Sequence, residues 1–597
     1  MGLYTRLPVE LTEVDVIVVG GGTAGCVVAA RLSDADPNLT ILVIEEGKNN
    51  DGDPSVMYPI LCFGSILPGS STTRAYVSNA EPQLSGRQVS VSVGNVLGGG
   101  SSVNLMMYSR AQRHDRDSWK TPGWTAEEML PFLKKLETYH GPDPKGVHGD
   151  QGPIVVSRGP YEMKKSEDDF INAATKLGWA EQADLQDLDS NNGVQRAKRL
   201  ISKDGQRSNT AHAYIHSRLG DDAHSNLHVL VETQVAKILF DGKRAVGVEV
   251  RANPKSQSDT TTQSIKARKL VVLSAGALAS PLILERSGLG DPNILKAANI
   301  PVIAPIPGIG KNYQDHHLIS YSYKSSLEPH ETIDGIFGGR VDIGNMIQTK
   351  DPRLGWNAQE VTCKLRPSEA DLSALGPEFQ AAYKKDFNGH PDKPLALMSF
   401  LSGYAADPTG NPAEQYMSIT TFTVYPYSRG HVHITGATLD DPVDFSTGFF
   451  ADPVDVTKHI WVYKKQREIA RRMQAYRGEV PAMHPPFPQS SAAALVETDA
   501  PLLANVTDIE YTAEDDAIIA QWARDHVGTT WHSLGTCNMA PLEQGGVVDE
   551  TLGVHGVEGL KIVDLSIAPG NVAANTAATA MAIGEKAADI IIKELGY

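Results

Sequence analysis

Two short apolar runs near the N-terminus, 15–19 and 41–44, lack the alternation of apolar and polar residues that marks a half-exposed strand. Such runs predict strands buried on both faces, as in a parallel sheet. Between them, the glycine-rich segment 20–25 ends the first run, and residues 26–32 predict a helix that stops before Pro37. A strand, a glycine turn, a helix and a second strand are the parts of a parallel crossover unit.

The middle of the chain changes to alternation and then returns to an apolar run. Residues 227–251 alternate like the strands of a hairpin, and a polar loop over 256–264 follows. Residues 270–276 predict another buried strand that leads into a helix. Strands of both kinds are therefore expected, some buried on both faces and some with one polar face.

The second half of the chain gives fewer clear patterns. Residues 320–420 mix helix-like segments with loops and predict no definite elements. Residues 455–478 predict a long amphipathic helix, and the proline cluster at 484–491 predicts a surface connection. Residues 576–595 predict a final helix with small residues at its start.

Length and composition limit the class of protein. A chain of 597 residues exceeds one typical domain, so at least two packed units are expected. A formal net charge of -17 gives no broad basic surface for nucleic acid or for a membrane surface. No run of 18 apolar residues occurs, so no membrane span is expected. The four cysteines lie far apart, without metal-ligand spacing, so neither a metal site nor a disulfide framework is expected.

The two ends of the chain bear on its location. No apolar stretch precedes the first predicted strand, so we expect no secretory signal. The C-terminal sequence KELGY carries no peroxisomal tripeptide. We therefore expect an intracellular protein, cytoplasmic or peroxisomal, in which the glycosylation-type sequences at Asn38 and Asn505 occur by chance.

The glycine-rich segment has the spacing of a dinucleotide-binding loop. Gly20, Gly22 and Gly25 follow a predicted buried strand, and Glu45 ends the next strand 20 residues after Gly25. The three glycines allow a tight turn, close approach of a pyrophosphate, and close packing of helix on strand. The carboxylate of Glu45 would accept hydrogen bonds from an adenosine ribose. This motif alone does not separate FAD from NAD.

The segment GNVLGGGSSVNLMMYSRA at 94–111 resembles the first signature of the glucose–methanol–choline (GMC) flavin oxidoreductases. Residues 276–290 resemble the second signature. Glu285 stands there where the family pattern has an aliphatic residue, which predicts a more exposed helix face. Further matches follow in family order, at 308–316, His532, 560–566 and Asn575.

This resemblance covers essentially the whole chain and implies an α/β fold with FAD as cofactor. The implied architecture is a Rossmann-like FAD-binding domain of GMC type with an α+β substrate-binding domain built on an antiparallel sheet. The FAD-binding domain would contain residues 1–160, 225–315 and 553–597. The substrate-binding domain would contain residues 161–224 and 316–552.

The resemblance also implies which residues contact FAD. Consecutive backbone N–H groups from Gly98 to Ser102 would form an anion-binding concavity, and Asn104 would bond the flavin end. The full set of cofactor-binding residues is Gly20, Gly22, Thr23, Ala24, Gly25, Glu45, Gly98, Gly99, Ser101, Ser102, Asn104, Met106, Val235, Trp531, Asp564 and Thr576.

Oxidation of an alcohol needs a base that takes the hydroxyl proton while a hydride leaves the carbon. Histidine suits this role because its pKa lies near neutral pH without a large shift, and a second polar group should hold the developing alkoxide. The resemblance places this pair at His532, within TTWHSLGTC (529–537), and at Asn575. A simple N-cap is the alternative role for Asn575, and a buried core histidine is the alternative for His532.

Leu105 and Trp531 are the expected substrate-pocket residues. Trp531 would form a pocket wall, with a plain core tryptophan as the alternative. At the position that matches Leu105, the fungal alcohol (methanol) oxidases of the family carry a phenylalanine, so a larger cavity is expected here. This chain resembles those oxidases within the family. It lacks their insertion before 508–511 and their C-terminal tail, so the resemblance does not support an octamer and leaves the oligomeric state open.

The expected function is FAD-dependent oxidation of a short- to medium-chain primary alcohol to the aldehyde, with oxygen reduced to hydrogen peroxide. A dehydrogenase with another electron acceptor is the first alternative, because oxygen reactivity is not visible in sequence. A lyase on the same scaffold, with a structural flavin, is the second, and a catalytically silent FAD-binding protein is the third.

Overall fold

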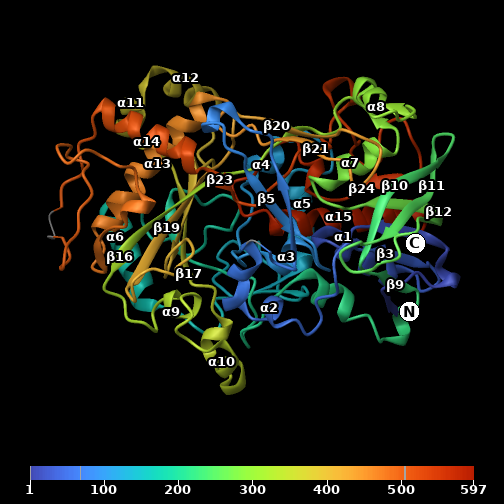
Figure 1. The fold of residues 1–597 in the computed structure, drawn as a ribbon, viewed down its shortest axis with the longest axis horizontal. Coiled ribbons are helices and arrows are strands. Elements are labelled where there is room, and N and C mark those ends of the chain that lie inside the picture. The colour runs from blue at the N-terminus through green and yellow to red at the C-terminus, as the bar shows by residue number, and fades with distance from the viewer. Residues whose placement is uncertain (1, 68, 503–505) are drawn as a thin grey trace.

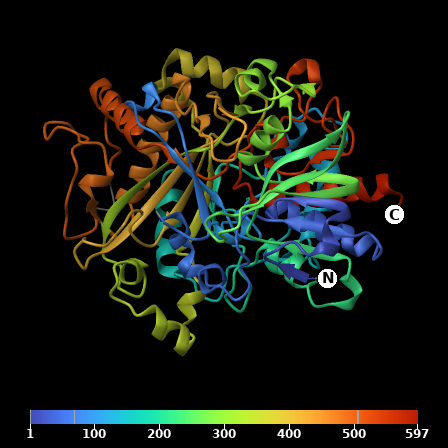
Figure 2. The ribbon, with the colours of Figure 1, turned by 45° about the vertical axis from the view of Figure 1, so that its right-hand side comes forward.

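The computed structural model describes residues 2–67, 69–502 and 506–597, which leaves Asn505 outside the described part of the chain. Two sheets lie side by side (Figures 1 and 2), one built from blue and green segments and the other mainly from yellow and orange segments. This arrangement confirms the predicted fold class, an α/β unit with a second unit built on an antiparallel sheet.

The first sheet has eight strands among the described residues. Their order is β1 (Gly2–Tyr4), β9 (Leu227–Leu230), β3 (Ile41–Ile44), β2 (Glu13–Val19), β12 (Gln263–Leu273), β11 (Arg244–Ala252) and β10 (Thr233–Asp241), and β24 (Leu560–Ile562) pairs with β12. Strands β1, β9, β3, β2, β12 and β24 pair in parallel, whereas β10 and β11 form an antiparallel hairpin. The predictions of buried strands at 15–19 and 41–44 are confirmed.

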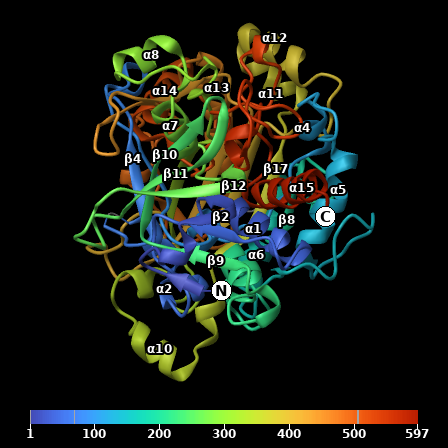
Figure 3. The ribbon, with the colours of Figure 1, turned by 90° about the vertical axis from the view of Figure 1, so that its right-hand side faces the viewer.

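Helix α1 (Thr23–Ala35) begins inside the glycine-rich segment and packs against the last helix, α15 (Ala577–Leu595), as Figure 3 shows. Small residues permit the close approach, since a Cβ on Gly584 would lie 2.9 Å from the Cβ of Val27. The predicted helix at 26–32 is therefore correct but starts three residues late. The predicted strand at 270–276 is confirmed for 270–273, the end of β12, and is wrong for 274–276, which lead to α7 (Ala279–Arg286).

The second sheet has seven strands within the described ranges, and all its pairings are antiparallel. The order is β22 (Tyr476–Glu479), β16 (His317–Ser325), β19 (Gln415–Thr423), β18 (Ala396–Leu401), β17 (Gln359–Leu365) and β8 (Gly193–Arg196), with β23 (Gly528–Thr529) paired to β16. Most of this sheet comes from 320–420, where the sequence pattern predicts no definite elements.

Helix α13 (Pro453–Arg471) packs against this second sheet. The predicted helix at 455–478 is confirmed as far as Arg471 and is wrong beyond it, because residues 476–479 form β22. The helix is also buried on more than one side rather than amphipathic. In the proline cluster, His484 and Phe487 are buried, so 484–491 is only in part the surface connection that its composition predicts.

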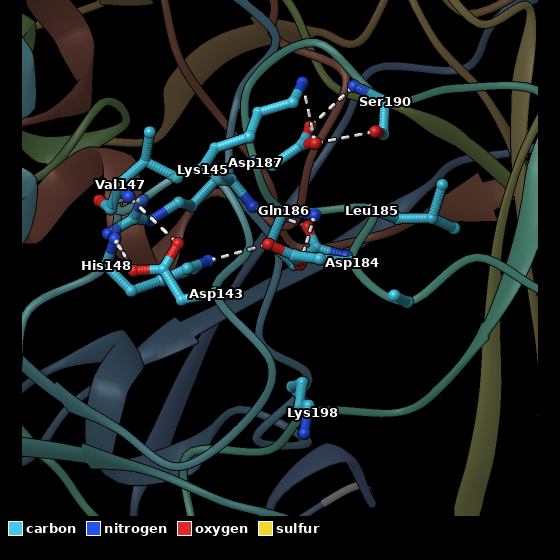
Figure 4. A network of polar contacts seen from close by, with 12 residues as sticks. Asp143, Lys145, Val147, His148, Asp184, Leu185, Gln186, Asp187, Ser190 and Lys198 are labelled. Carbon is cyan, nitrogen blue, oxygen red and sulfur yellow. Dashed lines mark hydrogen bonds and ion pairs between the residues drawn. The ribbon is translucent and has the colours of Figure 1, made fainter.

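A polar network joins residues 143–148 to the segment that precedes β8 (Figure 4). The ring of His148 bonds Glu137 through Nδ1 at 2.8 Å and Asp184 through Nε2 at 3.0 Å. Burial lowers the pKa of His148, but the two carboxylates outweigh it and the net shift is upward. Nearby, Lys145 forms an ion pair with Asp187 at 2.8 Å. His148 and Lys145, which lie at this junction, therefore each have carboxylate partners.

All four cysteines lie in the described part of the chain, and each is free and buried. Over the same described residues, no helix is both long enough and apolar enough to cross a membrane.

Candidate active site

A cavity of about 720 Å³ is lined by residues from both sheets. Gly20, Glu45 and Val235 contribute from the first sheet and its loops, and Thr420 and Phe422 contribute from β19 of the second. Its volume falls in the range of about 300–1,000 Å³ that is usual for ligand and cofactor sites.

Two glycine loops meet at one wall of this cavity. The N–H of Gly98 donates to the carbonyl of Gly21 at 2.7 Å. A Cβ on Gly99 would lie 2.8 Å from the Cα of Gly22, and Gly20 has a φ of +99°. Only residues without side chains allow this contact between two backbones that are 77 positions apart. The loop 20–25 and the loop at 98–102 are thus one structural unit.

The second glycine loop differs from expectation in where its N–H groups point. Those of Gly98, Gly99, Ser101 and Ser102 donate to carbonyl oxygens of the chain itself. The prediction that this run forms an anion-binding concavity is therefore wrong for these four groups. The reason is that the loop closes into a helical turn and packs on the first glycine loop.

Glu45 lies at the carboxyl end of β3 and is 6% exposed. Its two carboxylate oxygens accept hydrogen bonds from the backbone N–H groups of Gly21 at 2.9 Å and Gly47 at 2.8 Å. Burial raises the pKa of Glu45 to about 7, against the opposing effect of the bond from Gly47. Each oxygen has further acceptor capacity, so this acid both fixes the glycine loop and presents an acceptor to the cavity.

Most residues predicted to bind FAD lie on the cavity wall. These are Gly20, Gly22, Thr23, Ala24, Glu45, Gly99, Ser101, Asn104, Val235, Trp531, Asp564 and Thr576, together with Leu105. Gly25, Gly98, Ser102 and Met106 are not among the described residues that line it. Met106 is fully buried in the core, and Gly25 leaves room for the helix, since a Cβ there would lie 2.1 Å from the carbonyl oxygen of Gly20.

A buried carboxylate shapes the turn that carries His532. Asp315 accepts hydrogen bonds from Thr530 Oγ1 at 2.8 Å, from the N–H of His532 at 3.1 Å, and from Thr529 Oγ1. Burial raises the pKa of Asp315 to about 6. Trp531, within the turn, adopts a left-handed φ of +60°, a conformation that is strained for a bulky side chain. The hydrogen bonds from the turn to Asp315 stabilise it in this conformation.

His532 contacts a second histidine. Its Nδ1 lies 2.9 Å from Nδ1 of His316, which is fully buried. Burial lowers the pKa of His532 to about 3 and lowers that of His316 well below its usual value. The expectation that this histidine acts without a large pKa shift is therefore not met, because burial favours the neutral ring. Two neutral rings share the contact, so one Nδ1 carries the proton and the other accepts it.

Asn575 faces the other nitrogen of His532. Its Nδ2 lies 3.5 Å from His532 Nε2. Ser109 Oγ donates to Asn575 Oδ1 at 2.9 Å and accepts from the backbone N–H of Asn575 at 2.6 Å. This pair of bonds identifies Oδ1 and turns Nδ2 toward His532. Thr576, not Asn575, is the N-cap residue of α15.

Sequence reasoning did not assign Asp315, His316 and Ser109 to the site. Asp315 and His316 fall within the recognised segment 308–316, but nothing in that segment indicates a contact with His532. The ring of Phe422, which lies 5.8 Å from that of His532 at an angle of 73°, comes from a strand that the sequence pattern did not predict.

Glu285, next to the site on α7, is fully buried rather than exposed. Its carboxylate bonds His433 Nδ1 at 2.7 Å and accepts from the N–H of Ile434 at 2.8 Å. The predicted exposure of this helix face is therefore wrong, because the hydrogen bonds from His433 and Ile434 allow the carboxylate of Glu285 to be buried.

The cavity extends from a dinucleotide-binding loop to a potential proton acceptor, which is the arrangement of an oxidoreductase that holds a dinucleotide cofactor beside its substrate. The glycine contacts and the acceptor at Glu45 fit the diphosphate and ribose of such a cofactor. Family profiles described as GMC oxidoreductase match residues 14–318 and 426–584. The chain belongs to the GMC oxidoreductase family.

Individual relatives agree with this assignment. The chain is 39% identical to the alcohol oxidase of Candida boidinii, over 98% of this chain and 96% of that protein. It is 27% identical to an FAD-dependent oxidoreductase of known structure from Chaetomium thermophilum, with a TM-score of 0.78 and coverage of 98% and 99%. A formate oxidase structure has a TM-score of 0.83 at 22% identity and covers 98% of each chain, which shows the shared fold.

Proposed function

We propose that this protein is an FAD-dependent alcohol oxidase, which oxidises a primary alcohol to the aldehyde and reduces oxygen to hydrogen peroxide. The approach of His532 Nε2 and Asn575 Nδ2 to one point of the cavity, 3.5 Å apart, is the observation that carries the chemistry. The alcohol oxidases of Candida boidinii and Pichia angusta, 39% and 37% identical over nearly the full length, support the reaction class.

FAD, held by the two glycine loops, Glu45 and the wall at Asp564, would supply the acceptor for the hydride. His532 accepts the hydroxyl proton of the alcohol at Nε2 when its own proton is on Nδ1. Asn575 donates from Nδ2 to the alcohol oxygen and so stabilises its developing negative charge. As His532 becomes an imidazolium, its Nδ1–H donates to Nδ1 of His316, which keeps the new charge hydrogen-bonded inside a buried site.

We propose a preference for short- to medium-chain alcohols. Leu105 lies on the cavity wall, and its side chain is smaller than the phenylalanine that the resemblance leads us to expect at this position in the alcohol oxidases. The cavity is also lined by Leu318, Leu401 and Phe422 from the second sheet, which gives an alkyl chain apolar surface. Burial of each added methylene is worth about 0.8 kcal/mol, so the preference follows from apolar area.

We also propose the domain division of residues 1–160, 225–315 and 553–597 against 161–224 and 316–552. Every strand of the first sheet falls in the first set, and every strand of the second sheet falls in the second set. One segment does not fit this division. The π-helical turn Ala211–His216 belongs to the second set by sequence but packs against α1 of the first set. The boundary that precedes β9 therefore belongs before this turn.

The test is anaerobic reduction of the flavin by ethanol. His532→Ala should retain its flavin absorbance and be reduced about 10²–10⁴-fold more slowly, the usual effect of losing a general base. His330→Ala, which removes an exposed histidine away from the cavity, serves as the matched control. Reduction of His532→Ala at the wild-type rate would place the base elsewhere.

The same experiment separates the alternative functions. Failure of the wild type to bleach with any alcohol would favour a lyase or a silent flavoprotein. Bleaching without peroxide release after air is readmitted would favour a dehydrogenase. Bleaching followed by one peroxide per flavin is the expected result.

A further inference from the structure

Three potential metal ligands meet on the surface behind the second glycine loop. Asp51 follows β3, whereas His212 and His216 stand four residues apart in the π-helical turn Ala211–His216. One ring nitrogen from each histidine and a carboxylate oxygen of Asp51 all lie within 4.8 Å of one another. None of the three is among the described residues that line the cavity, so this cluster is separate from the proposed active site.

The ring of His212 is oriented by a neighbouring amide. Asn209 Oδ1 accepts from the backbone N–H of His212 at 2.9 Å, which identifies that atom as the oxygen. His212 Nδ1 lies 3.0 Å from the same oxygen and must therefore donate to it. The lone pair of this neutral ring is then on Nε2. That atom is buried, has no hydrogen-bond partner among the described residues, and lies 4.0 Å from Asp51 Oδ1.

The ring of His216 is oriented in the same way by Asn50. Asn50 Nδ2 donates to the carbonyl of Leu97 and to Ser102 Oγ, each at 2.9 Å, so its Oδ1 faces the histidine. His216 Nε2 lies 2.8 Å from that oxygen and must donate, which leaves the lone pair on Nδ1. Both histidines thus have the outer hydrogen bond, from one ring nitrogen to a fixed oxygen, that usually accompanies a metal-binding imidazole.

The third potential ligand is a carboxylate at the surface. Asp51 supplies the carboxylate. Its side chain is 67% exposed, which leaves it free to turn toward the two rings.

We propose that Asp51, His212 and His216 bind one divalent transition-metal ion of the zinc type. Two imidazoles and one carboxylate suit Zn²⁺, Cu²⁺, Ni²⁺ or Co²⁺ rather than Mg²⁺ or Ca²⁺, which prefer all-oxygen ligands. Water would complete the coordination on the exposed side. Because Asn50 also bonds Leu97 and Ser102, a bound ion would brace the backbone that supports the second glycine loop.

The test uses the flavin-loaded, full-length protein without a histidine tag. Zn²⁺ is titrated in competition with a chromophoric chelator, and Cu²⁺ binding is followed by electron paramagnetic resonance. We expect one ion per chain whose affinity falls at least tenfold in His212→Gln and in Asp51→Asn. The copper spectrum should show coupling to two imidazole nitrogens in the wild type and to one in His212→Gln.

Two features of the design keep the result interpretable. Asp51 is exposed, so Asp51→Asn leaves the core intact. His224→Gln is the matched control, because both ring nitrogens of His224 already bond the carboxylates of Asp34 and Asp221. Equal Zn²⁺ affinity in the wild type, Asp51→Asn and His212→Gln would overturn the proposal, as would an equal loss in His224→Gln.

Discussion

Replacing His316 by leucine removes the group that accepts the Nδ1 proton of His532. In the wild type the two Nδ1 atoms lie 2.9 Å apart inside the protein, so no water replaces the lost acceptor. Before reaction the loss concerns a bond between neutral groups, which is worth about 1 kcal/mol. Once His532 has taken the alcohol proton, the loss concerns a bond from a charged group, which is worth about 1.5–3 kcal/mol.

The charged state is the one formed during the reaction, so the effect should fall mainly on its rate. The barrier rises by the difference between the two losses, about 0.5–2 kcal/mol, which makes the reduction roughly 2–30-fold slower because 1.36 kcal/mol is a factor of ten. The dissociation constant of the alcohol should hardly change, since the neutral bond is lost equally from the free enzyme and from its alcohol complex. The variant His316→Asn offers an amide oxygen as acceptor and should recover most of the rate.

Anaerobic stopped-flow reduction with ethanol measures both quantities from the loss of flavin absorbance. The pH profile adds a check. Burial lowers the pKa of His532 to about 3, so the base stays deprotonated and its titration should leave no limb near pH 6.5. Wild-type rates in His316→Leu, or equal losses in His316→Leu and His316→Asn, would refute the positioning role of His316.

Three further predictions concern other parts of the chain. Burial raises the pKa of Glu45 to about 7, so FAD binding to the apoprotein should weaken about tenfold for each pH unit below 7. Glu45→Gln should abolish this dependence on pH. The affinity is measured by fluorescence quenching, and a wild-type affinity that does not change with pH would contradict the prediction. Leu105→Phe should shift kcat/KM toward methanol in a series from methanol to hexanol, by about fourfold per methylene, whereas a wild type that already peaks at methanol would exclude the larger cavity. Glu285→Leu should lower the free energy of unfolding in urea by about 3 kcal/mol, because it leaves His433 and a backbone N–H buried without an acceptor. Adding His433→Leu should recover part of that loss, and no recovery would argue against the pairing.

The first sheet was predictable in part because its central parallel strands are short, uninterrupted apolar runs. Ile41–Ile44 is apolar throughout, and it is buried throughout. Strand β17 shows why the second sheet was not predictable. It is buried at every position although it contains Glu360 and Lys364. Glu360 pairs with Arg199, and Lys364 donates to the carbonyl of Arg110, so distant partners make the burial of these charges tolerable.

In the candidate site, the proposed catalytic residues could be predicted from the sequence, but their supporting contacts could not. Residue identity and order point to His532 and Asn575, and the structure places both on the cavity wall. Their supporting contacts depend on pairings across 216 residues to His316 and across 466 residues to Ser109, which no local pattern contains. The same limit explains the error at Glu285, where a partner 148 residues away reverses the expected exposure.

The burial of all four thiols bears on how long such an enzyme would survive its own product. Hydrogen peroxide attacks the thiolate form of cysteine. Burial raises the pKa of Cys26 and of Cys62 to about 12, and it raises those of Cys363 and Cys537 as well, so almost no thiolate exists at neutral pH. Met107, by contrast, is only partly buried and lines the cavity in which the peroxide would form. Oxidative ageing during turnover would therefore begin at the Met107 thioether on the cavity wall rather than at any cysteine.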